Sequence, residues 1–336
     1  MGKSIVNMKT KDNIKLSIVA PVYGVEKYIR QWLDSVYDQD IPESEYEVIC
    51  VNDCTPDKSA DIIREYQKQH ANLILINHEV NKKDNASRNT GYRAARGKYI
   101  WFNDPDDMVA SKCYGTIIKK MEENQLDMLH WSIVSTNGEQ IRTLNDTEVM
   151  SGVELMQRTH GTPQFDNTFT WNRCYRRQVL VDAEIFFREE RGCDVLQTLQ
   201  GIDVAKRCMD VKECYYFYRN DNLTNYSHTD TTKAWRIMAY AFRLGKYVYE
   251  LPVSEDFRFI TDEAGPWRVN QVKKVLMRMP VAELKKLYTM LDEEPDVKAF
   301  VLQHANKCVR LELTHPYLVM VISPFYKLAR IVRNAI

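Results

Sequence analysis

The chain has 336 residues, enough for one large domain or for a domain with a smaller companion. Basic and acidic residues number 46 each, and this zero net charge argues against bulk nucleic-acid binding, which needs a basic surplus. We expect no signal peptide and no membrane span, because no apolar stretch reaches the roughly 18 residues that a span requires. The eight scattered cysteines show no zinc-type spacing and predict reduced thiols in a cytosolic protein.

Apolar and amphipathic runs alternate over the first third of the chain. Four apolar runs predict strands: KLSIVAPVY, YEVICVND, NLILIN and KYIWFND. Three runs between them predict helices: EKYIRQWLDSVYDQD, SADIIREYQKQH and NASRNTGYRAARG. This alternation predicts an α/β fold in which βαβ units build a mostly parallel central sheet flanked by helices.

The pattern is less regular after residue 108. LDMLHWSIVST and VKECYYFYRN predict two more strands, and TWNRCYRRQVLVDAEIFF predicts a helix followed by a turn. After residue 230 the segments have helical periodicity. We therefore divide the chain into residues 14–230, which hold the predicted sheet, and a helical C-terminal region, residues 231–336.

The stretch YIWFNDPDD, residues 99–107, places Asp104, Asp106 and Asp107 directly after a predicted buried strand. Like charges at this spacing repel one another and require a positive partner. A Mg²⁺ or Mn²⁺ ion fits, because such ions take one or two protein carboxylates and complete their shell with water and phosphate oxygens. The cluster thus predicts a metal that holds a diphosphate. The alternative is that Asp106 and Asp107 cap a helix beginning at Met108.

Two other predicted strands end in polar tips, VYG at residues 22–24 and VNDCTPD at residues 51–57. Ligands of parallel sheets bind beyond the carboxyl ends of the strands, so these tips and the carboxylate cluster predict one site. With the segment NASRNTGYRAARG, they follow one another in an order that resembles the family 2 glycosyltransferases, over roughly residues 14–230. The resemblance implies the GT-A fold, which is Rossmann-like. It also implies a nucleotide-sugar donor, most simply a UDP-sugar, a Mn²⁺ or Mg²⁺ ion, and transfer with inversion at the anomeric carbon.

The resemblance implies donor-binding roles for residues at the strand ends and on one helix: Pro21, Val22, Tyr23, Asp53, Arg88, Asn89 and Asp104. Tyr23 matches an aromatic residue that packs on the nucleobase, and Asp53 matches a carboxylate that binds the base or its ribose. Asp104 and Asp106 match the DXD motif, in which the first carboxylate faces the ribose and donor sugar and the second faces the metal. We expect Arg88 to fix Asp104 through a bidentate bond.

Inverting transfer requires a carboxylate that takes the proton of the acceptor hydroxyl. The family supplies it from a Glu-Asp pair after a phenylalanine that Phe187 matches. The pair falls on Cys193 and Asp194, so Asp194 is the predicted base. Glu189 and Glu190 are the runners-up, because a short shift of this loop would bring either of them to the same place.

The segment YRNDNLTNYSH contributes two weaker candidates, Arg219 and His228, for contact with the diphosphate or the metal. The loop before Arg88 departs from the family, because Lys82 and Lys83 stand where glycine is common. This departure and Cys193 favour an alternative function, a catalytically silent nucleotide-sugar-binding protein of a polysaccharide assembly complex. A sugar nucleotidyltransferase is a third reading, against which the single glycine of APVYGVEKY argues.

The last segment, residues 315–336, combines Lys327, Arg330 and Arg333 with apolar side chains and has no acidic side chain. This pattern predicts an interfacial amphipathic helix, and the alternative is a helix packed on the body of the protein. In the family such regions serve acceptor binding, homodimer formation or membrane contact. The sequence therefore predicts an inverting glycosyltransferase of surface-polysaccharide assembly, cytoplasmic and peripheral on the inner face of the cell membrane, with a saccharide or lipid-linked saccharide acceptor.

Overall fold

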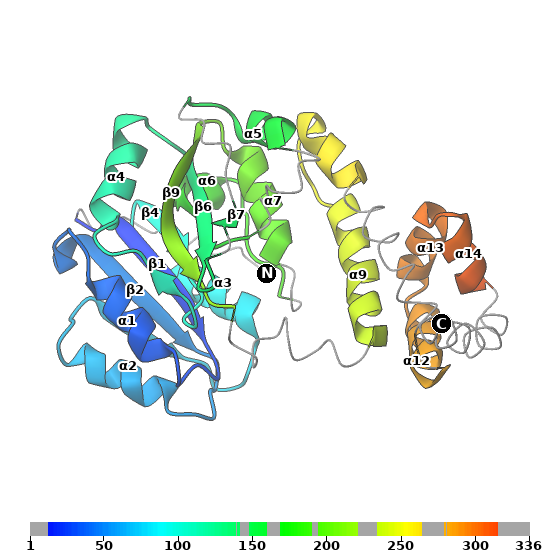
Figure 1. Cartoon of the computed structure of the whole chain (residues 1–336), viewed down its shortest axis with the longest axis horizontal. Helices are drawn as coiled ribbons and strands as arrows, with labels where there is room; N and C mark the ends of the chain where they lie inside the picture. Colours follow the sequence, from blue (N-terminus) through cyan, green and yellow to red (C-terminus); the bar gives the residue numbers. More distant parts are fainter. Residues whose placement is uncertain are drawn as a thin grey trace, which may run out of the picture. The chain divides into compact units, whose positions relative to one another are not determined.

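The computed structural model describes residues 13–138, 140–141, 148–159, 169–189, 194–220, 234–263, 279 and 281–314. The chain divides into two compact units, Met1–Asn222 and Leu223–Ile336 (Figure 1). In its described part the first unit is an α/β domain, and the second is helical. The sequence placed the change to the helical region near residue 230.

The first unit is organised around one curled sheet. Its described strands are β1 (Leu16–Val22), β2 (Tyr46–Asn52), β3 (Leu73–Asn77), β4 (Tyr99–Phe102), β5 (Met108–Val109), β6 (Met128–Ser135), β7 (Gln140–Ile141), β8 (Arg173–Arg176) and β9 (Cys208–Tyr218). They lie in the order β3-β2-β1-β4-β8-β6-β9-β5, with β7 paired to β6. The first four strands of this order are parallel, as are β6 and β9, whereas β8 and β5 run antiparallel to their neighbours.

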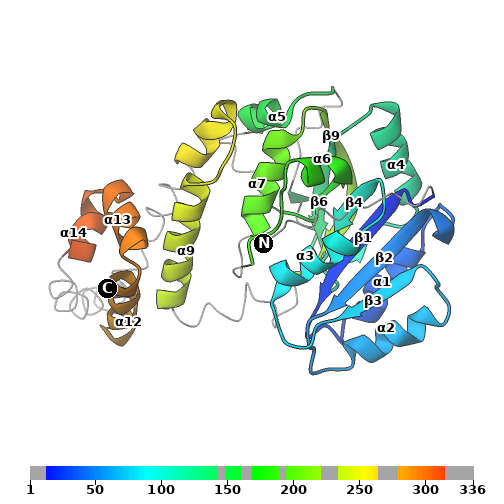
Figure 2. The same cartoon turned by 180° about the vertical axis from the view of Figure 1, so that it is seen from behind.

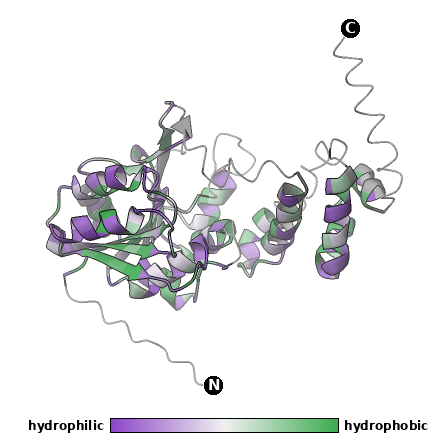
Figure 3. Ribbon diagram, turned by 90° about the horizontal axis from the view of Figure 1, so that it is seen from below, coloured by the Kyte–Doolittle hydropathy of each residue, from purple (hydrophilic) through white to green (hydrophobic). Residues whose placement is uncertain are grey.

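Helices cover both faces of the sheet (Figures 1 and 2). The described helices of this unit are α1 (Ile29–Tyr37), the 3₁₀ turn η1 (Glu43–Glu45), α2 (Ser59–Gln67), α3 (Asp84–Ala94), α4 (Tyr114–Glu123), α5 (Gly152–Thr159), α6 (Arg177–Asp182) and α7 (Asp194–Val204). Because side chains alternate along a strand, Ile18 and Ala20 join Trp32 of α1 in the core of one face. On the other face α3 lies so close that a Cβ added to Gly91 would be 2.4 Å from Cγ1 of Val19. Figure 3 shows apolar strands between helices of mixed polarity.

The second unit has its own apolar core. Its described elements are α9 (Ala234–Tyr249), η3 (Glu255–Phe257), α12 (Val281–Glu293), α13 (Pro295–His304) and α14 (Lys307–Thr314). Phe242, Leu284, Leu287 and Val301 are buried together in it. No helix of the described residues is long and apolar enough to cross a membrane. The amphipathic helix predicted for residues 315–336 lies outside the described residues.

The predicted α/β fold with a mostly parallel sheet is confirmed, and two local predictions are wrong. The segment that begins at Thr170 was expected to open with a helix, but Arg173–Arg176 form β8. Tyr175 of β8 pairs with both Ile100 and Met128, so long-range pairing overrides the local pattern. No helix begins at Met108 either, because β5 pairs with β9 there, which removes the proposed helix cap.

Candidate active site

A buried arginine lies between Asp104, a predicted site carboxylate, and Asp84, which the sequence did not predict as part of the site. Arg88 is only 5% exposed, and its Nη2 donates to Oδ1 of Asp104 at 2.6 Å. Its Nη1 donates to Asp84 at 3.0 Å and to the side-chain oxygen of Asn85 at 3.1 Å. The expected bidentate bond to Asp104 is therefore wrong: Arg88 bridges Asp104 and Asp84 with different nitrogens. This bridge joins α3 to the carboxyl end of β4.

The charges around Arg88 keep it ionised despite its burial. Burial alone would lower the pKa of Arg88, but the carboxylates of Asp104, Asp84 and Asp194 outweigh it, so the pKa is raised. Nε of Arg88 is buried and has no hydrogen-bond partner among the described residues. The guanidinium also lies over the ring of Phe187, 5.7 Å from its centroid. Arg88 thus holds the Asp104 carboxylate in the loop after β4, and its Nε has no hydrogen-bond partner among the described residues.

Asp107, the third carboxylate of the cluster, holds its own loop in place. It is 2% exposed, and it accepts bonds of 2.7 Å from the hydroxyl of Tyr216 and from the backbone N–H of Arg219. Burial, and then the charges of Asp106 and Asp104, raise its pKa well above the usual range. The Tyr216 hydroxyl also accepts the N–H of Asp104 at 3.0 Å. Asp107 and Tyr216 therefore fix the loop that presents Asp104 and Asp106.

Arg219 binds the same loop. Its Nε donates to the backbone carbonyl of Asp106 at 2.8 Å, and its Nη2 donates to Gln31 at 2.5 Å. Its guanidinium lies 5.0 Å from the ring centroid of Tyr28. We predicted contact with a diphosphate or metal for Arg219, and the contacts that the structure gives it are with the protein. His228, its companion candidate, lies outside the described residues.

The polar face of α3 also binds the segment that precedes the predicted base. Asn89 donates to the carbonyl of Phe187 at 2.8 Å and accepts the N–H of Phe187 at 2.9 Å. Asn85 donates to the carbonyl of Arg188 at 2.8 Å. The sequence predicted a donor contact for Asn89 and missed this one, although the spacing of residues 85, 88 and 89 places all three on one helix face.

Asp194 is the first residue of α7 and is partly buried. Burial raises its pKa, Arg88 lowers it, and Asp84 and Asp104 raise it again, with a net increase. These interactions show that the structure brings the predicted base into the same group of charges as Arg88 and Asp104. Glu189 is exposed, while Glu190 and Cys193 lie outside the described residues.

The loops after β1 and β2 are joined at the same edge of the sheet. Tyr23 is 53% exposed, whereas Val22 is buried and its carbonyl accepts the N–H of Asp53 at 3.0 Å. Pro21, before them, is partly buried. Gly24 has a φ of 69°, which favours glycine, and its N–H donates to the hydroxyl of Thr55 at 2.9 Å. The aromatic ring of Tyr23 is therefore presented to solvent beside a fixed turn.

Asp53 organises the loop that departs from the family pattern. It is 2% exposed, and its two oxygens accept the backbone N–H groups of Lys82 and Lys83, each at 2.7 Å. Its carbonyl accepts the side-chain amide of Asn81 at 3.1 Å. Lys83 adopts φ 75° and ψ 172°, a region that is nearly exclusive to glycine. The loop thus keeps a glycine-type backbone although the residue is lysine.

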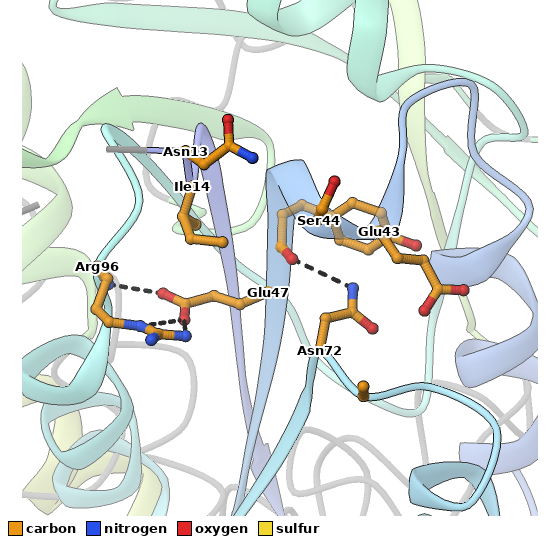
Figure 4. A pocket seen from close by; sticks show the side chains of 9 residues that line it. Asn13, Ile14, Glu43, Ser44, Glu47, Asn72 and Arg96 are labelled. Atoms are coloured by element: carbon orange, nitrogen blue, oxygen red, sulfur yellow. Dashed lines mark hydrogen bonds and ion pairs between the residues drawn. The ribbon is translucent and has the colours of Figure 1, made fainter. Parts of the chain in front are cut away.

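A cavity of about 670 Å³ lies at the opposite edge of the sheet (Figure 4). Its lining residues come just before or at the start of parallel strands, and Figure 4 shows Arg96 bound to Glu47 on one side of it. Arg96 neutralises Glu47 at 2.7 Å, and Ser17 donates to the same carboxylate. Since ligands of such sheets bind at the carboxyl ends of the strands, this cavity is separate from the candidate site.

Residues 17–182 match the sequence profile of glycosyl transferase family 2. Those residues are a family 2 glycosyltransferase domain. The chain is 32% identical to the uncharacterized glycosyltransferase EpsJ of Bacillus subtilis over 61% of each chain. It is 35% identical to the poly(ribitol-phosphate) beta-glucosyltransferase of Bacillus spizizenii over 85% of this chain and 52% of the relative, so it spans little more than half the length of these relatives.

Solved structures support the GT-A fold. Residues 1–349 of Staphylococcus aureus TarS, in complex with UDP-GlcNAc, match with a TM-score of 0.67 at 19% identity, over 92% of this chain and 89% of that one. The mannosyltransferase PcManGT of Pyrobaculum calidifontis, in complex with GDP-Man and Mn²⁺, matches with a TM-score of 0.54 at 16% identity, over 96% and 90%. At this identity the likeness concerns the fold.

A metal site of the family 2 domain would use Asp104 and Asp106. No group of three or more His, Cys, Asp or Glu side chains in the described residues could hold a metal by itself. Two carboxylates fit a hard divalent ion that takes its other ligands from water and phosphate. Asp104 and Asp106 stand one residue apart after β4, with Oδ1 of Asp104 bound to Arg88. The residues therefore fit such an ion when a diphosphate is bound with it.

The unusual backbone at Lys83 predicts opposite effects for two adjacent glycine substitutions. Lys83→Gly should raise the free energy of unfolding by about 1 kcal/mol, because it removes a strained conformation and keeps the N–H that binds Asp53. Lys82→Gly should lower it by about 0.5 kcal/mol, because it adds chain entropy to the unfolded state and relieves nothing. Urea denaturation measures both. Equal losses in the two variants would contradict the strain at Lys83.

Proposed function

We propose that this chain is an inverting glycosyltransferase that moves a sugar from a UDP-sugar to a hydroxyl of a saccharide acceptor in surface-polysaccharide assembly. The observation that supports it best is the group of charges around Arg88, which binds a DXD carboxylate directly and whose positive charge lowers the pKa of the candidate base, Asp194, against the increase that burial causes. The family 2 domain supports the reaction class. The TarS complexes with UDP-GlcNAc and UDP support the donor class, and the poly(ribitol-phosphate) glycosyltransferases among the relatives support a hydroxyl-bearing surface polymer as the acceptor.

In this proposal the donor lies along the carboxyl ends of β1, β2 and β4. The exposed ring of Tyr23 stacks on the nucleobase. Asp53, with its oxygens bound to the loop, contributes by holding Lys82 and Lys83 beside the nucleoside. Nε of Arg88, which has no partner among the described residues, donates to an oxygen of the donor sugar or diphosphate.

Transfer requires one bond to form, one to break and one proton to move. Asp194 takes the proton of the acceptor hydroxyl while the oxygen attacks the anomeric carbon. The bond between that carbon and the diphosphate breaks, and UDP leaves with the bonding electrons. Asp104 and Asp106 would hold a Mn²⁺ or Mg²⁺ ion, which would supply positive charge to the leaving diphosphate. The raised pKa of Asp194 makes it a stronger base than an exposed aspartate.

Asp106→Ala tests the metal. The variant should lose transfer activity and the part of its UDP affinity that depends on Mn²⁺, because one carboxylate ligand is removed. Isothermal titration with UDP, with and without Mn²⁺, measures this. Asp61→Ala, on the exposed face of α2, is the matched control and should behave as the wild type. If Mn²⁺ leaves UDP affinity unchanged in all three proteins, the metal proposal is wrong.

Asp194→Asn tests the base. It should keep UDP affinity and lower turnover by at least about a hundredfold, the low end for a general base. Wild-type kcat/KM should fall as the pH drops through the pKa of Asp194, because the base must be ionised. Burial raises this pKa, so the fall should begin at a higher pH than for an exposed aspartate. Glu189→Gln and Glu190→Gln are the controls. If Glu190→Gln loses activity and Asp194→Asn retains it, the base is Glu190.

The same assays separate an enzyme from a silent binder. A competent glycosyltransferase should release some sugar from the donor to water even without an acceptor, and Asp194→Asn should reduce this release. A wild-type chain that binds UDP but neither transfers nor hydrolyses the sugar would support the silent binder instead. The hydrogen bonds from the N–H groups of Lys82 and Lys83 to Asp53 favour the enzyme, because they hold this loop in its glycine-type backbone conformation although lysine replaces glycine.

We also propose that residues 315–336 place the protein on the inner face of the membrane, beside a lipid-linked acceptor. Deleting them should leave UDP binding intact and abolish co-sedimentation with anionic liposomes at low salt. Three cations contribute on the order of 1 kcal/mol each near such a surface, so binding should weaken as salt rises. Full-length protein that stays in the supernatant at low salt, or a truncation that unfolds the chain, would contradict membrane contact.

A further inference from the structure

A buried histidine connects Asp53 to the helix that holds Arg88. His78 follows β3, and its Nδ1 lies 2.8 Å from Oδ1 of Asp53. Its Nε2 lies 2.9 Å from the hydroxyl of Thr90 on α3. The side chains of His78 and Asp53 are only 5% and 3% exposed. The imidazole therefore forms a closed bridge between the carboxyl end of β2 and the middle of α3, and neither the family resemblance nor the sequence pattern pointed to it.

The donor and acceptor roles are fixed between His78 and Asp53, whereas those between His78 and Thr90 can be exchanged. An ionised carboxylate only accepts, so the ring donates from Nδ1 to Asp53. The Thr90 hydroxyl lies 3.1 Å from the carbonyl of Ala86 and can donate there while it accepts from Nε2, or it can donate to Nε2. The connection to α3 persists in both arrangements.

We propose that His78 is a positioning residue of the donor site, which sets affinity for the nucleoside diphosphate through Asp53 and the loop of residues 81–83. The inference rests on the proposed function, because it assumes that this loop borders the donor. His78 and Lys82 bind Oδ1 of Asp53, and Lys83 binds Oδ2. His78 thus restricts the rotation of the carboxylate that receives both loop N–H groups.

The backbone of Lys83 explains why this restriction matters. A non-glycine residue stays in such a conformation only when the surrounding structure over-determines it. The bond from its N–H to Asp53 is one such constraint, and it is only as rigid as the Asp53 carboxylate. Without His78 the carboxylate can rotate, the loop can relax toward an ordinary φ, and the N-terminal turn of α3 loses its tie to β2.

Two other histidine–carboxylate pairs provide matched controls. His130 lies 2.8 Å from Asp210, and both side chains are as buried as His78 and Asp53. His70 lies 2.8 Å from Glu43, which lines the cavity at the opposite edge of the sheet. His130 and Asp210 join β6 to β9, and His70 joins the segment after α2 to η1, whereas His78 joins the end of β2 to α3. Replacing His130 or His70 measures the loss of a histidine–carboxylate pair without a change at the donor site.

The experiment measures UDP affinity by titration and donor KM, acceptor KM and kcat by a transfer assay. His78→Ala should raise the UDP Kd and the donor KM about tenfold, the effect of losing a charge-assisted bond, and leave kcat at saturating donor within about threefold. The acceptor KM should not change. His78→Asn should recover part of the affinity, because its amide can donate to Asp53. Thr90→Val should weaken UDP binding less than His78→Ala.

Coupling between the two partners gives a sharper test. If Thr90 acts through His78, the double variant His78→Ala/Thr90→Val should bind UDP as His78→Ala does, not additively worse. His130→Asn and His70→Ala should lower the unfolding midpoint at most and leave the donor KM at the wild-type value. A rise in donor KM in these controls equal to that of His78→Ala would overturn the proposal.

The remaining outcomes separate this inference from the proposed function. A folded His78→Ala that binds UDP as tightly as the wild type overturns the role of His78 alone. If His78→Ala does not fold, wild-type UDP affinity in both His78→Asn and Thr90→Val overturns it instead. A wild-type chain that binds no UDP overturns the proposed function, and the inference falls with it.

Discussion

The candidate site depends on one buried guanidinium. A charge as enclosed as that of Arg88 is costly unless carboxylates surround it, and here Asp104 and Asp84 bind it directly. Asp84 lies on the same helix as Arg88, so the bond to Asp104 is the one that holds the helix to the loop after β4. The close approach of Gly91 to Val19 fixes the same helix against the sheet. The guanidinium can therefore occupy only a narrow range of positions.

Helix α3 joins three parts of the chain that are far apart in sequence. Arg88 holds the end of β4, Asn89 holds the backbone of Phe187, and Thr90 connects through His78 to the end of β2. Three consecutive residues thus bind the loop after β4, the segment before the predicted base, and the histidine that contacts Asp53. Such fixed geometry before substrate binds is what transfer chemistry requires, because misplacement of reacting groups by about 1 Å can cost on the order of a hundredfold in rate.

The three carboxylates of the NDPDD stretch differ in environment, and the environments suggest different roles. Asp104 is bound to an arginine, Asp107 is buried against the Tyr216 hydroxyl, and Asp106 lies partly buried between them. The protein itself therefore offsets the clustered negative charge at two of these positions. Arg88 supplies a positive charge to Asp104, and the Tyr216 hydroxyl and the Arg219 N–H donate hydrogen bonds to Asp107.

The sequence by itself determined the order of strands and helices along the first hundred residues, because that order follows from hydrophobic periodicity within short windows. It predicted polar side chains at the ends of three of these strands. It also identified Arg88 and Asp104 as partners. Only the tertiary structure decided that Asn89 binds Phe187, that Asp107 binds Tyr216 and that His78 binds Asp53, pairs separated by 98, 109 and 25 positions. It also made a strand of Arg173–Arg176, by pairing it between β4 and β6. Long-range hydrogen bonds leave no periodic trace in a sequence, since each depends on how distant segments meet after the chain has folded.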